Sequence, residues 1–122
     1  MNDRAIVADT SVLIHFLEGN PEAREWLLGR EVHISIATEI ELLTMGRTKR
    51  NALEVITRTL ALCYVWDISP LIKEHCIWLR SEYRMKLADA LVAATATSLN
   101  MQLLTADRDF MRLKDVVDLN FI

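Results

Sequence analysis

The sequence predicts an α/β fold, a three-layer α/β/α sandwich with a mainly parallel central sheet, in which residues 1–122 form a single domain. Short apolar segments typical of strands alternate with longer segments typical of helices, which is the pattern of a parallel sheet covered on both faces. The length of 122 residues, with 52% hydrophobic and 25% charged residues, is that of one globular domain. No repeat, low-complexity tract or linker divides the chain.

In the first half of the chain, strands are predicted where apolar and β-branched residues run together, and helices where a capping residue precedes a helical segment. Asn20 and Pro21 supply the cap and the first position of one helix. The predicted elements are a strand over Ala5–Ala8, a helix over Ser11–Glu18 that Gly19 ends, a helix from Pro21 to Gly29, a strand over Val32–Ile36, a helix from Thr38 to near Gly46, and a helix over Lys49–Leu62.

The second half of the chain continues this alternation. Ser69 and Pro70 begin one helix, and a later alanine-rich segment predicts a helix whose small side chains allow close packing on a sheet. The predicted elements are a strand over Tyr64–Ile68, helices over Pro70–Tyr83 and Leu87–Leu99, a strand over Gln102–Thr105, a short helix over Arg108–Lys114, and a candidate edge strand over Asp118–Phe121.

Four acidic residues lie where these strands end or helices begin: Asp9, Glu41, Asp89 and Asp107. In open α/β sheets, ligands bind beyond the carboxyl ends of the strands, and Asp9 and Asp107 closely follow two of them. Carboxylates gathered at one edge repel one another unless a divalent cation lies between them. The pattern therefore predicts a metal site with oxygen ligands, and with it phosphodiester chemistry.

Helix capping is the alternative explanation for each acid taken singly. Asp9 or Asp107 could cap the helix that follows it, and Asp89 could cap its helix or interact favourably with the helix dipole. For Glu41 alone, capping is the better explanation, because Thr38 and Glu41 have the spacing of a capping box. The presence of four acids at helix starts that open toward one sheet edge favours a shared site.

Composition excludes several other classes of protein. No apolar run approaches the roughly 18 residues that a membrane span requires, and the segment Met1–Ala5 lacks the basic and apolar regions of a signal peptide. Cys63 and Cys76 have no metal-type spacing and are expected to be buried free thiols in a reducing cytosol. We therefore expect a cytoplasmic protein. The three histidines show no zinc-site spacing and are expected to be structural: His15, His33 and His75.

The net charge of −3 does not exclude a nucleic-acid partner. Setting aside the four acids and Asp109 removes five negative charges and raises the net charge to +2. A basic rim around an acidic pocket suits a phosphate backbone, although a solvated helix face is the ordinary explanation for clustered charges. The basic residues cluster as Arg47, Lys49 and Arg50, and as Arg80, Arg84 and Lys86.

Each of the four acids lies in a short motif. Asp9 begins Asp-Thr-Ser after an apolar strand, and Asp107 follows Thr105-Ala106. In these motifs the chain resembles the PIN domain family, and specifically its small toxin nucleases of the VapC type; the second motif places Glu41, rather than Glu39, in the position of the functional acid. The resembling segments, spread over nearly the whole chain, are Val7–Ile14, Ser35–Leu42, Asp89–Ala96 and Thr105–Phe110.

The resemblance implies a Mg²⁺- or Mn²⁺-dependent endoribonuclease. It implies that Asp9 and Asp89 are the main metal ligands, and that Glu41 and Asp107 complete the cluster directly or through metal-bound water. The residues that it implies in supporting roles are Ser11 and Thr105, which would hold the acids or the phosphate by hydrogen bonds, and Asp109.

The resemblance also implies partners. The substrate would be transfer, ribosomal or messenger RNA. A cognate antitoxin encoded alongside would block the acidic pocket with its tail, often by presenting a basic side chain. A homodimer through helices of the first half would account for exposed apolar residues such as Trp26.

Three alternatives stay open. A PIN nuclease of RNA processing or decay would use the same residues. A haloacid-dehalogenase-like phosphatase requires a second Asp where this chain has Ser11, and a receiver domain requires an acidic pair where it has Ala8-Asp9, although Asp67 could pass for the acceptor of a receiver. A catalytically silent metal- or RNA-binding module would keep the fold and the acids.

Overall fold

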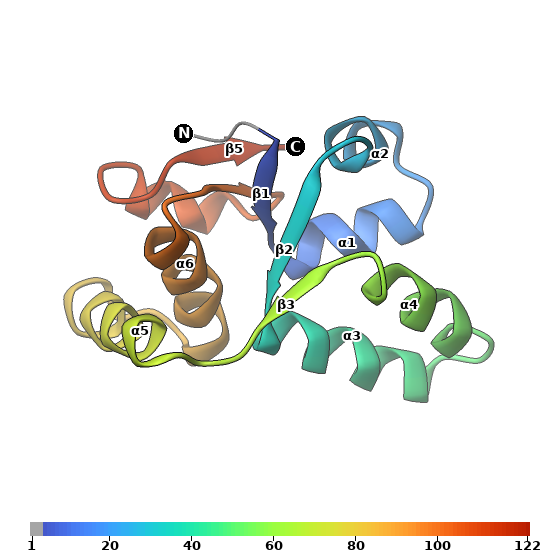
Figure 1. Cartoon of the computed structure of the whole chain (residues 1–122), viewed down its shortest axis with the longest axis horizontal. Helices are drawn as coiled ribbons and strands as arrows, with labels where there is room; N and C mark the ends of the chain where they lie inside the picture. Colours follow the sequence, from blue (N-terminus) through green and yellow to red (C-terminus); the bar gives the residue numbers. More distant parts are fainter. Residues whose placement is uncertain (1–3) are drawn as a thin grey trace.

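Five strands form one sheet in the computed structural model, which describes residues 4–122, and every strand pair in it is parallel. The strand order is β3-β2-β1-β4-β5, so β1 lies at the centre (Figure 1). Residues 1–3, which carry much of the argument against a signal peptide, lie outside the described residues. The strands are β1 (Ala5–Ala8), β2 (Glu31–Ser35), β3 (Tyr64–Trp66), β4 (Gln102–Thr105) and β5 (Leu119–Phe121).

Helices cover both faces of the sheet. Figure 1 shows α5, α6 and η1 on one side of the strands and α1 to α4 on the other. This arrangement confirms the predicted three-layer α/β/α sandwich. The helices are α1 (Thr10–Leu17), α2 (Pro21–Leu27), α3 (Ile36–Thr48), α4 (Leu53–Leu60), α5 (Pro70–Tyr83), α6 (Leu87–Leu99) and the 3₁₀ helix η1 (Arg108–Leu113).

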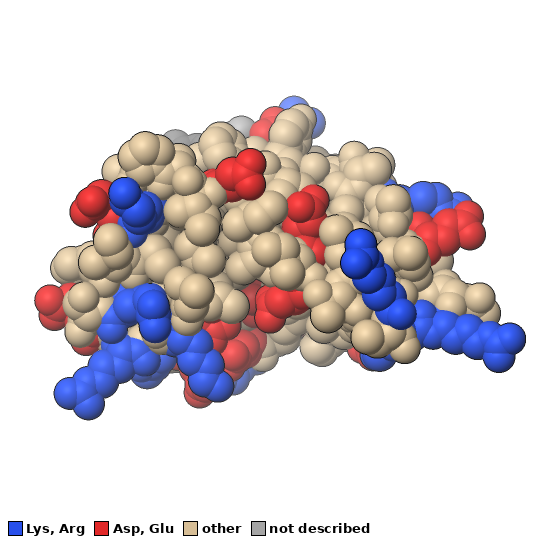
Figure 2. Space-filling view, turned by 90° about the horizontal axis from the view of Figure 1, so that it is seen from below, with Lys and Arg blue, Asp and Glu red and all other residues tan. Residues whose placement is uncertain are grey.

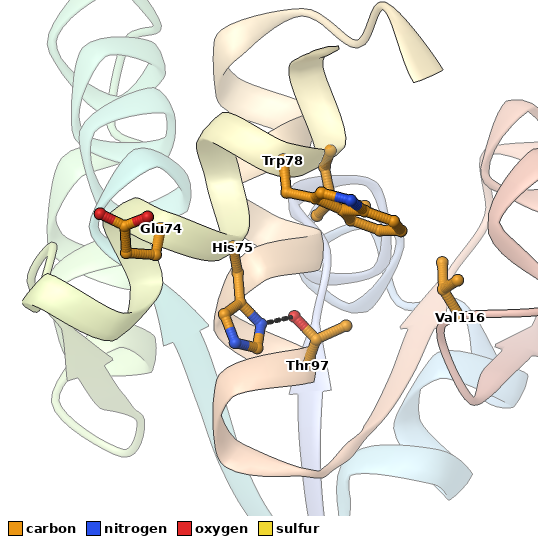
Figure 3. Close-up of a pocket in the computed structure, with 6 residues that line it drawn as sticks. Glu74, His75, Trp78, Thr97 and Val116 are labelled. Carbon is orange, nitrogen blue, oxygen red and sulfur yellow. Dashed lines mark hydrogen bonds between the residues drawn. The ribbon is translucent and has the colours of Figure 1, made fainter. Parts of the chain in front are cut away.

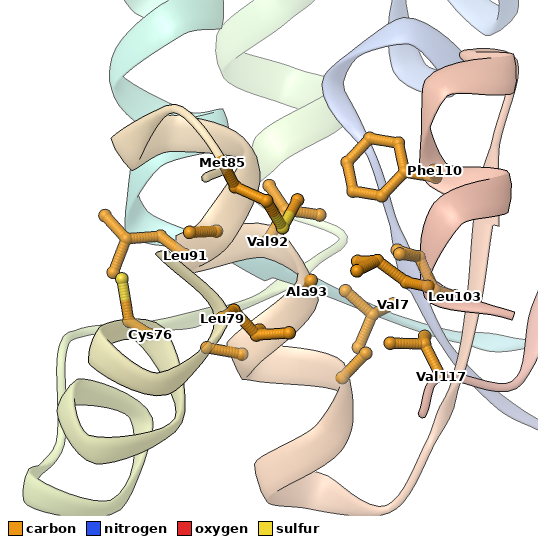
Figure 4. Packing of buried hydrophobic residues seen from close by; sticks show 14 of the residues in the cluster. Val7, Cys76, Leu79, Met85, Leu91, Val92, Ala93, Leu103, Phe110 and Val117 are labelled. Atoms are coloured by element: carbon orange, nitrogen blue, oxygen red, sulfur yellow. The ribbon is translucent and has the colours of Figure 1, made fainter. Parts of the chain in front are cut away.

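The two faces of the sheet bury two separate apolar clusters. In β1, Val7 packs into the cluster with α5, α6 and η1, whereas Ile6 and Ala8 pack into the cluster with α1 to α4. All four residues of β1 are buried, which explains why this strand is a continuous apolar run rather than an alternating one. Figure 4 shows the first cluster, in which Phe110 and Val117 lie beside Val7 and Leu103.

Most differences from the predicted boundaries lie at element ends. One is at α3, which begins at Ile36 and not at Thr38, because the Ser35 side chain caps the helix by accepting a hydrogen bond from the N–H of Ala37 over 3.1 Å. The predicted helix from Lys49 begins only at Leu53, after a turn in which Asn51 has φ 63°.

None of the helices in residues 4–122 is long and apolar enough to cross a membrane. Both cysteines are free, with Cys76 buried and Cys63 half-buried. Burial raises the pKa of the Cys63 thiol to about 11, so this thiol stays protonated and unreactive near neutral pH. The histidines have structural contacts; for example, Nδ1 of the buried His33 accepts a hydrogen bond from Nε1 of Trp66 over 2.9 Å.

Candidate active site

The structure brings the four predicted acids together at the carboxyl edge of the sheet. Asp9 directly follows β1, Asp107 follows β4, Glu41 lies on α3, and Asp89 lies in the first turn of α6. The pKa of the Asp89 carboxyl is raised, first by burial and then by the negative charges of Asp9, Asp107 and Glu41, while Lys86 partly offsets the effect. The four carboxylates therefore interact electrostatically across four elements.

Asp9 is the most tightly held of these acids. Only 6% of its surface is exposed, and its two oxygens accept three hydrogen bonds. The N–H of Thr10 donates to Oδ1 over 2.8 Å, and the hydroxyls of Ser11 and Thr105 each donate to Oδ2 over 2.8 Å. Burial nevertheless raises the pKa of Asp9, and these donors oppose the rise by favouring the ionised form.

Ser11 and Thr105 each connect Asp9 to the turn that carries Asp107. The Ser11 hydroxyl accepts from the N–H of Ala106 over 3.1 Å, and the Thr105 hydroxyl accepts from the N–H of Asp107 over 3.0 Å. Each hydroxyl therefore receives a hydrogen bond from this turn and donates one to the Asp9 carboxylate. Two short side chains thus join the ends of β1 and β4, and a supporting role for them in catalysis stays a prediction.

Glu41 does not form the capping box that its spacing with Thr38 suggested. Thr38 is a fully buried residue inside α3, two positions after the helix begins, so that interpretation was wrong. The carboxylate of Glu41 instead accepts a hydrogen bond from the hydroxyl of Thr10 over 2.7 Å. No spacing in the sequence indicates the contact of Thr10 with Glu41, because it depends on how α1 packs against α3.

The capping explanations hold for two of the other acids. Asp9 is the N-cap of α1 as well as a member of the cluster, and Asp107 is the N-cap of η1, accepting from the N–H of Asp109 over 2.9 Å. Asp89 is not a cap, because the N-cap position of α6 is Lys86. Asp109 is exposed and contacts the cluster through its main chain, so a role for its carboxylate stays a prediction.

Charge is distributed unevenly over the face at the carboxyl ends of the strands. Figure 2 shows this face from below, with acidic side chains near its middle and lysine and arginine side chains gathered toward both flanks. The six basic residues singled out in the sequence are all exposed. They lie at the end of α3 (Arg47, Lys49, Arg50) and at the α5–α6 connection (Arg80, Arg84, Lys86).

A separate apolar cavity of about 310 Å³ includes none of the four acids. Figure 3 shows Trp78 and Val116 beside it, with His75 and Thr97 joined by a hydrogen bond. That bond, between His75 Nδ1 and the Thr97 hydroxyl, spans 2.7 Å and links α5 to α6. His75 is therefore a structural residue, as predicted.

Replacing Asp89 by Asn should stabilise the metal-free protein at neutral pH. The pKa of Asp89 is higher in the folded protein than its value of 3.8 in the unfolded chain, so the folded protein keeps the carboxyl proton to a higher pH. Ionisation of Asp89 therefore disfavours folding as the pH rises above 3.8. The expected gain is on the order of 0.5 kcal/mol, reduced by solvent screening, or roughly 2 °C in Tm. Thermal unfolding at pH 7 and pH 3 should show the gain only at pH 7.

Asp115→Asn, at an exposed acid outside the cluster, is the control and should leave Tm unchanged. A lower Tm for Asp89→Asn at pH 7 would contradict repulsion among the four acids.

The fold and the four motifs place the chain in a known class. The PIN domain family model matches residues 6–116, and the chain belongs to this family, as the resemblance of its motifs predicted. No protein of curated function matches the sequence significantly.

Several solved structures contain chains with the same fold. A toxin–antitoxin complex from Klebsiella pneumoniae matches at 26% identity and a TM-score of 0.82, over 94% of this chain and 95% of that one. DNA-bound VapBC from Salmonella typhimurium matches at 18% identity and a TM-score of 0.83, over 96% of this chain and 97% of that one. FitAcB from Neisseria gonorrhoeae matches at 22% identity and a TM-score of 0.78, over 94% of this chain and 96% of that one. At these identities, the Salmonella and Neisseria structures show a similarity of fold alone.

Proposed function

We propose that this protein is a metal-dependent endoribonuclease that hydrolyses RNA phosphodiester bonds as the cytoplasmic toxin of a VapBC-type toxin–antitoxin pair. The observation that carries the proposal is the gathering of four acids at the carboxyl edge of a PIN fold, where the charges of Asp9, Asp107 and Glu41 add to the effect of burial in raising the pKa of Asp89. Such coupling disfavours the metal-free, fully ionised site and favours a bound cation.

The donor set suits Mg²⁺ or Mn²⁺. Asp9, Asp89, Glu41 and Asp107 offer only carboxylate oxygens, the ligands that these ions prefer. Within residues 4–122, no group of three or more acidic, histidine or cysteine side chains is arranged to hold a metal ion directly, so the proposal rests on donor chemistry and charge. When bound, the ion would lower the pKa of a coordinated water and offset charge on the phosphoryl oxygens.

The chain's own groups would orient the acids and the substrate. The three donors around Asp9 fix the direction of this carboxylate and favour its ionised form, which opposes the effect of burial on its pKa. The basic residues at the end of α3 and at the α5–α6 connection would contact the RNA backbone on either side of the acids, which predicts binding that weakens with salt.

The proposed partners are a cognate antitoxin and a second copy of the chain. The similar structures from Klebsiella and Salmonella are a toxin–antitoxin complex and DNA-bound VapBC, and the acidic edge would accept a basic antitoxin side chain. Trp26 was a poor indicator of a dimer surface, because it is half-buried and stacks with the Arg30 guanidinium 4.7 Å from its ring centre. The proposed homodimer therefore draws no support from Trp26.

The proposal is tested by incubating the antitoxin-free protein with total cellular RNA and mapping new 5′ ends. With Mg²⁺ or Mn²⁺ we expect discrete cuts, and with EDTA none. Co-expression with the product of the neighbouring gene should yield a complex that does not cut. If the free protein cuts no RNA with either metal, the nuclease proposal is wrong; if it cuts but binds no neighbouring product, only the toxin assignment is wrong.

A further inference from the structure

We propose that Thr10 is a positioning residue that joins two acids of the site and sets its affinity for a divalent cation through Glu41. The inference rests on the proposed metal-dependent function. The main-chain N–H of Thr10 donates to Asp9 Oδ1 over 2.8 Å, and its hydroxyl donates to Glu41 Oε1 over 2.7 Å. Thr10 thus contacts its neighbour in the chain and an acid 31 positions away.

The direction of these hydrogen bonds follows from the proton count. The Thr10 hydroxyl has one proton and also lies 3.1 Å from the hydroxyl of Thr38. Because an ionised Glu41 can only accept, the Thr10 proton goes to Glu41, and Thr38 donates its own proton to Thr10. The result is a chain of hydrogen bonds from the fully buried Thr38 through Thr10 to the exposed carboxylate of Glu41.

These hydrogen bonds through Thr10 matter more for the orientation of the Glu41 side chain than for that of Asp9. Asp9 is buried and has three donors, whereas Glu41 is an exposed residue with a longer side chain on the surface of α3. An exposed Glu samples many rotamers, so a hydroxyl fixed by α1 restricts it toward the cluster. Groups that orient metal ligands in this way commonly change metal affinity or activity by about 10- to 100-fold when removed.

The test compares Thr10→Val, which keeps the shape and removes the hydroxyl, with Thr10→Ser, which keeps the hydroxyl. Titration calorimetry with Mn²⁺ on the antitoxin-free protein measures the affinity without relying on cleavage. We expect Thr10→Val to bind Mn²⁺ about tenfold more weakly and Thr10→Ser to stay within about twofold of the original protein. The Mn²⁺ concentration for half-maximal cleavage should rise in parallel.

Two controls separate positioning from a general effect on the fold. Thr44→Val removes a hydroxyl from α3, the helix that carries Glu41; the Thr44 hydroxyl donates to the Ile40 carbonyl over 2.7 Å, and its loss should leave Mn²⁺ affinity unchanged. In a Glu41→Gln background, Thr10→Val should weaken Mn²⁺ binding no further, because its effect passes through the Glu41 carboxylate. If Thr10→Val does not fold, Thr10→Ala removes the same hydroxyl without placing a methyl group against Thr38.

The outcomes distinguish this inference from the proposed function. If the original protein binds Mn²⁺ and cuts RNA, but the hydroxyl-free variant binds Mn²⁺ equally well, the role of Thr10 is overturned and the nuclease proposal stands. An equal loss in the Glu41→Gln background would also overturn it. If the original protein neither binds Mn²⁺ nor cuts RNA, the proposed function itself fails.

Discussion

RNA cleavage should fall by on the order of 10³-fold or more when Asp9 is replaced by Asn. The substitution keeps the shape of the side chain but removes the negative charge at the centre of the acidic cluster. It also places an amide group where two hydroxyls and one main-chain N–H now donate to the carboxylate. Initial cleavage rates on a mapped RNA fragment at saturating Mg²⁺ measure the effect.

The fold of Asp9→Asn should survive, because the side chain keeps its volume and its oxygen can still accept. A circular dichroism spectrum and a cooperative thermal transition check this. Asp67→Asn, at an exposed acid outside the cluster, is the matched control and should cleave at the original rate. Metal-dependent cleavage that persists at full rate in Asp9→Asn would remove Asp9 from the site.

Phe110→Ala should lower the free energy of unfolding by about 3–5 kcal/mol. Phe110 is only 2% exposed and fills the space between η1 and the central strands, beside Val7 and Leu103 (Figure 4). Truncation removes the apolar transfer free energy of the ring and leaves a cavity that the surrounding β-strands cannot collapse to fill. Urea unfolding at 25 °C measures the loss as a lower midpoint at an unchanged m-value.

The same substitution should also affect the site. The N–H of Phe110 donates to the carbonyl of Asp107 over 3.2 Å, so a loosened η1 would loosen the turn that carries this acid. The control is Met111→Ala, because Met111 is the next residue and is 48% exposed. This substitution should change the free energy of unfolding by no more than about 0.5 kcal/mol. A loss below 1 kcal/mol for Phe110→Ala would contradict the described packing of η1.

Local signals were sufficient for the sheet and for the acids. The run Ala5–Ala8 is apolar throughout because both faces of β1 are covered, and such a run indicates a central parallel strand without tertiary information. The positions of Asp9 and Asp107 follow from the same reasoning, because residues that end parallel strands meet at one edge of the sheet; those of Glu41 and Asp89 depend also on how α3 and α6 pack.

The errors arose where two local signals competed. Ser35 and Thr38 can both cap a helix, and Thr38 has the additional Glu41 three positions later, so the capping box was the stronger pattern. The structure uses Ser35, and Thr38 becomes a buried side chain that contacts Thr10 from another helix. A contact of this kind depends on how two helices pack, and no spacing within either helix indicates it.

The position of β1 between β2 and β4 has a consequence for synthesis of the protein. Ribosomes extend a chain at about 5–20 residues per second, so the N-terminal elements emerge first. Asp9 appears early, but Thr105, its hydrogen-bonding partner, lies 96 positions later, and one side of the central strand has no neighbour until β4 has been made. The acids are therefore assembled only in a nearly complete chain, and products truncated before β4 would have an open sheet edge instead of an acidic cluster.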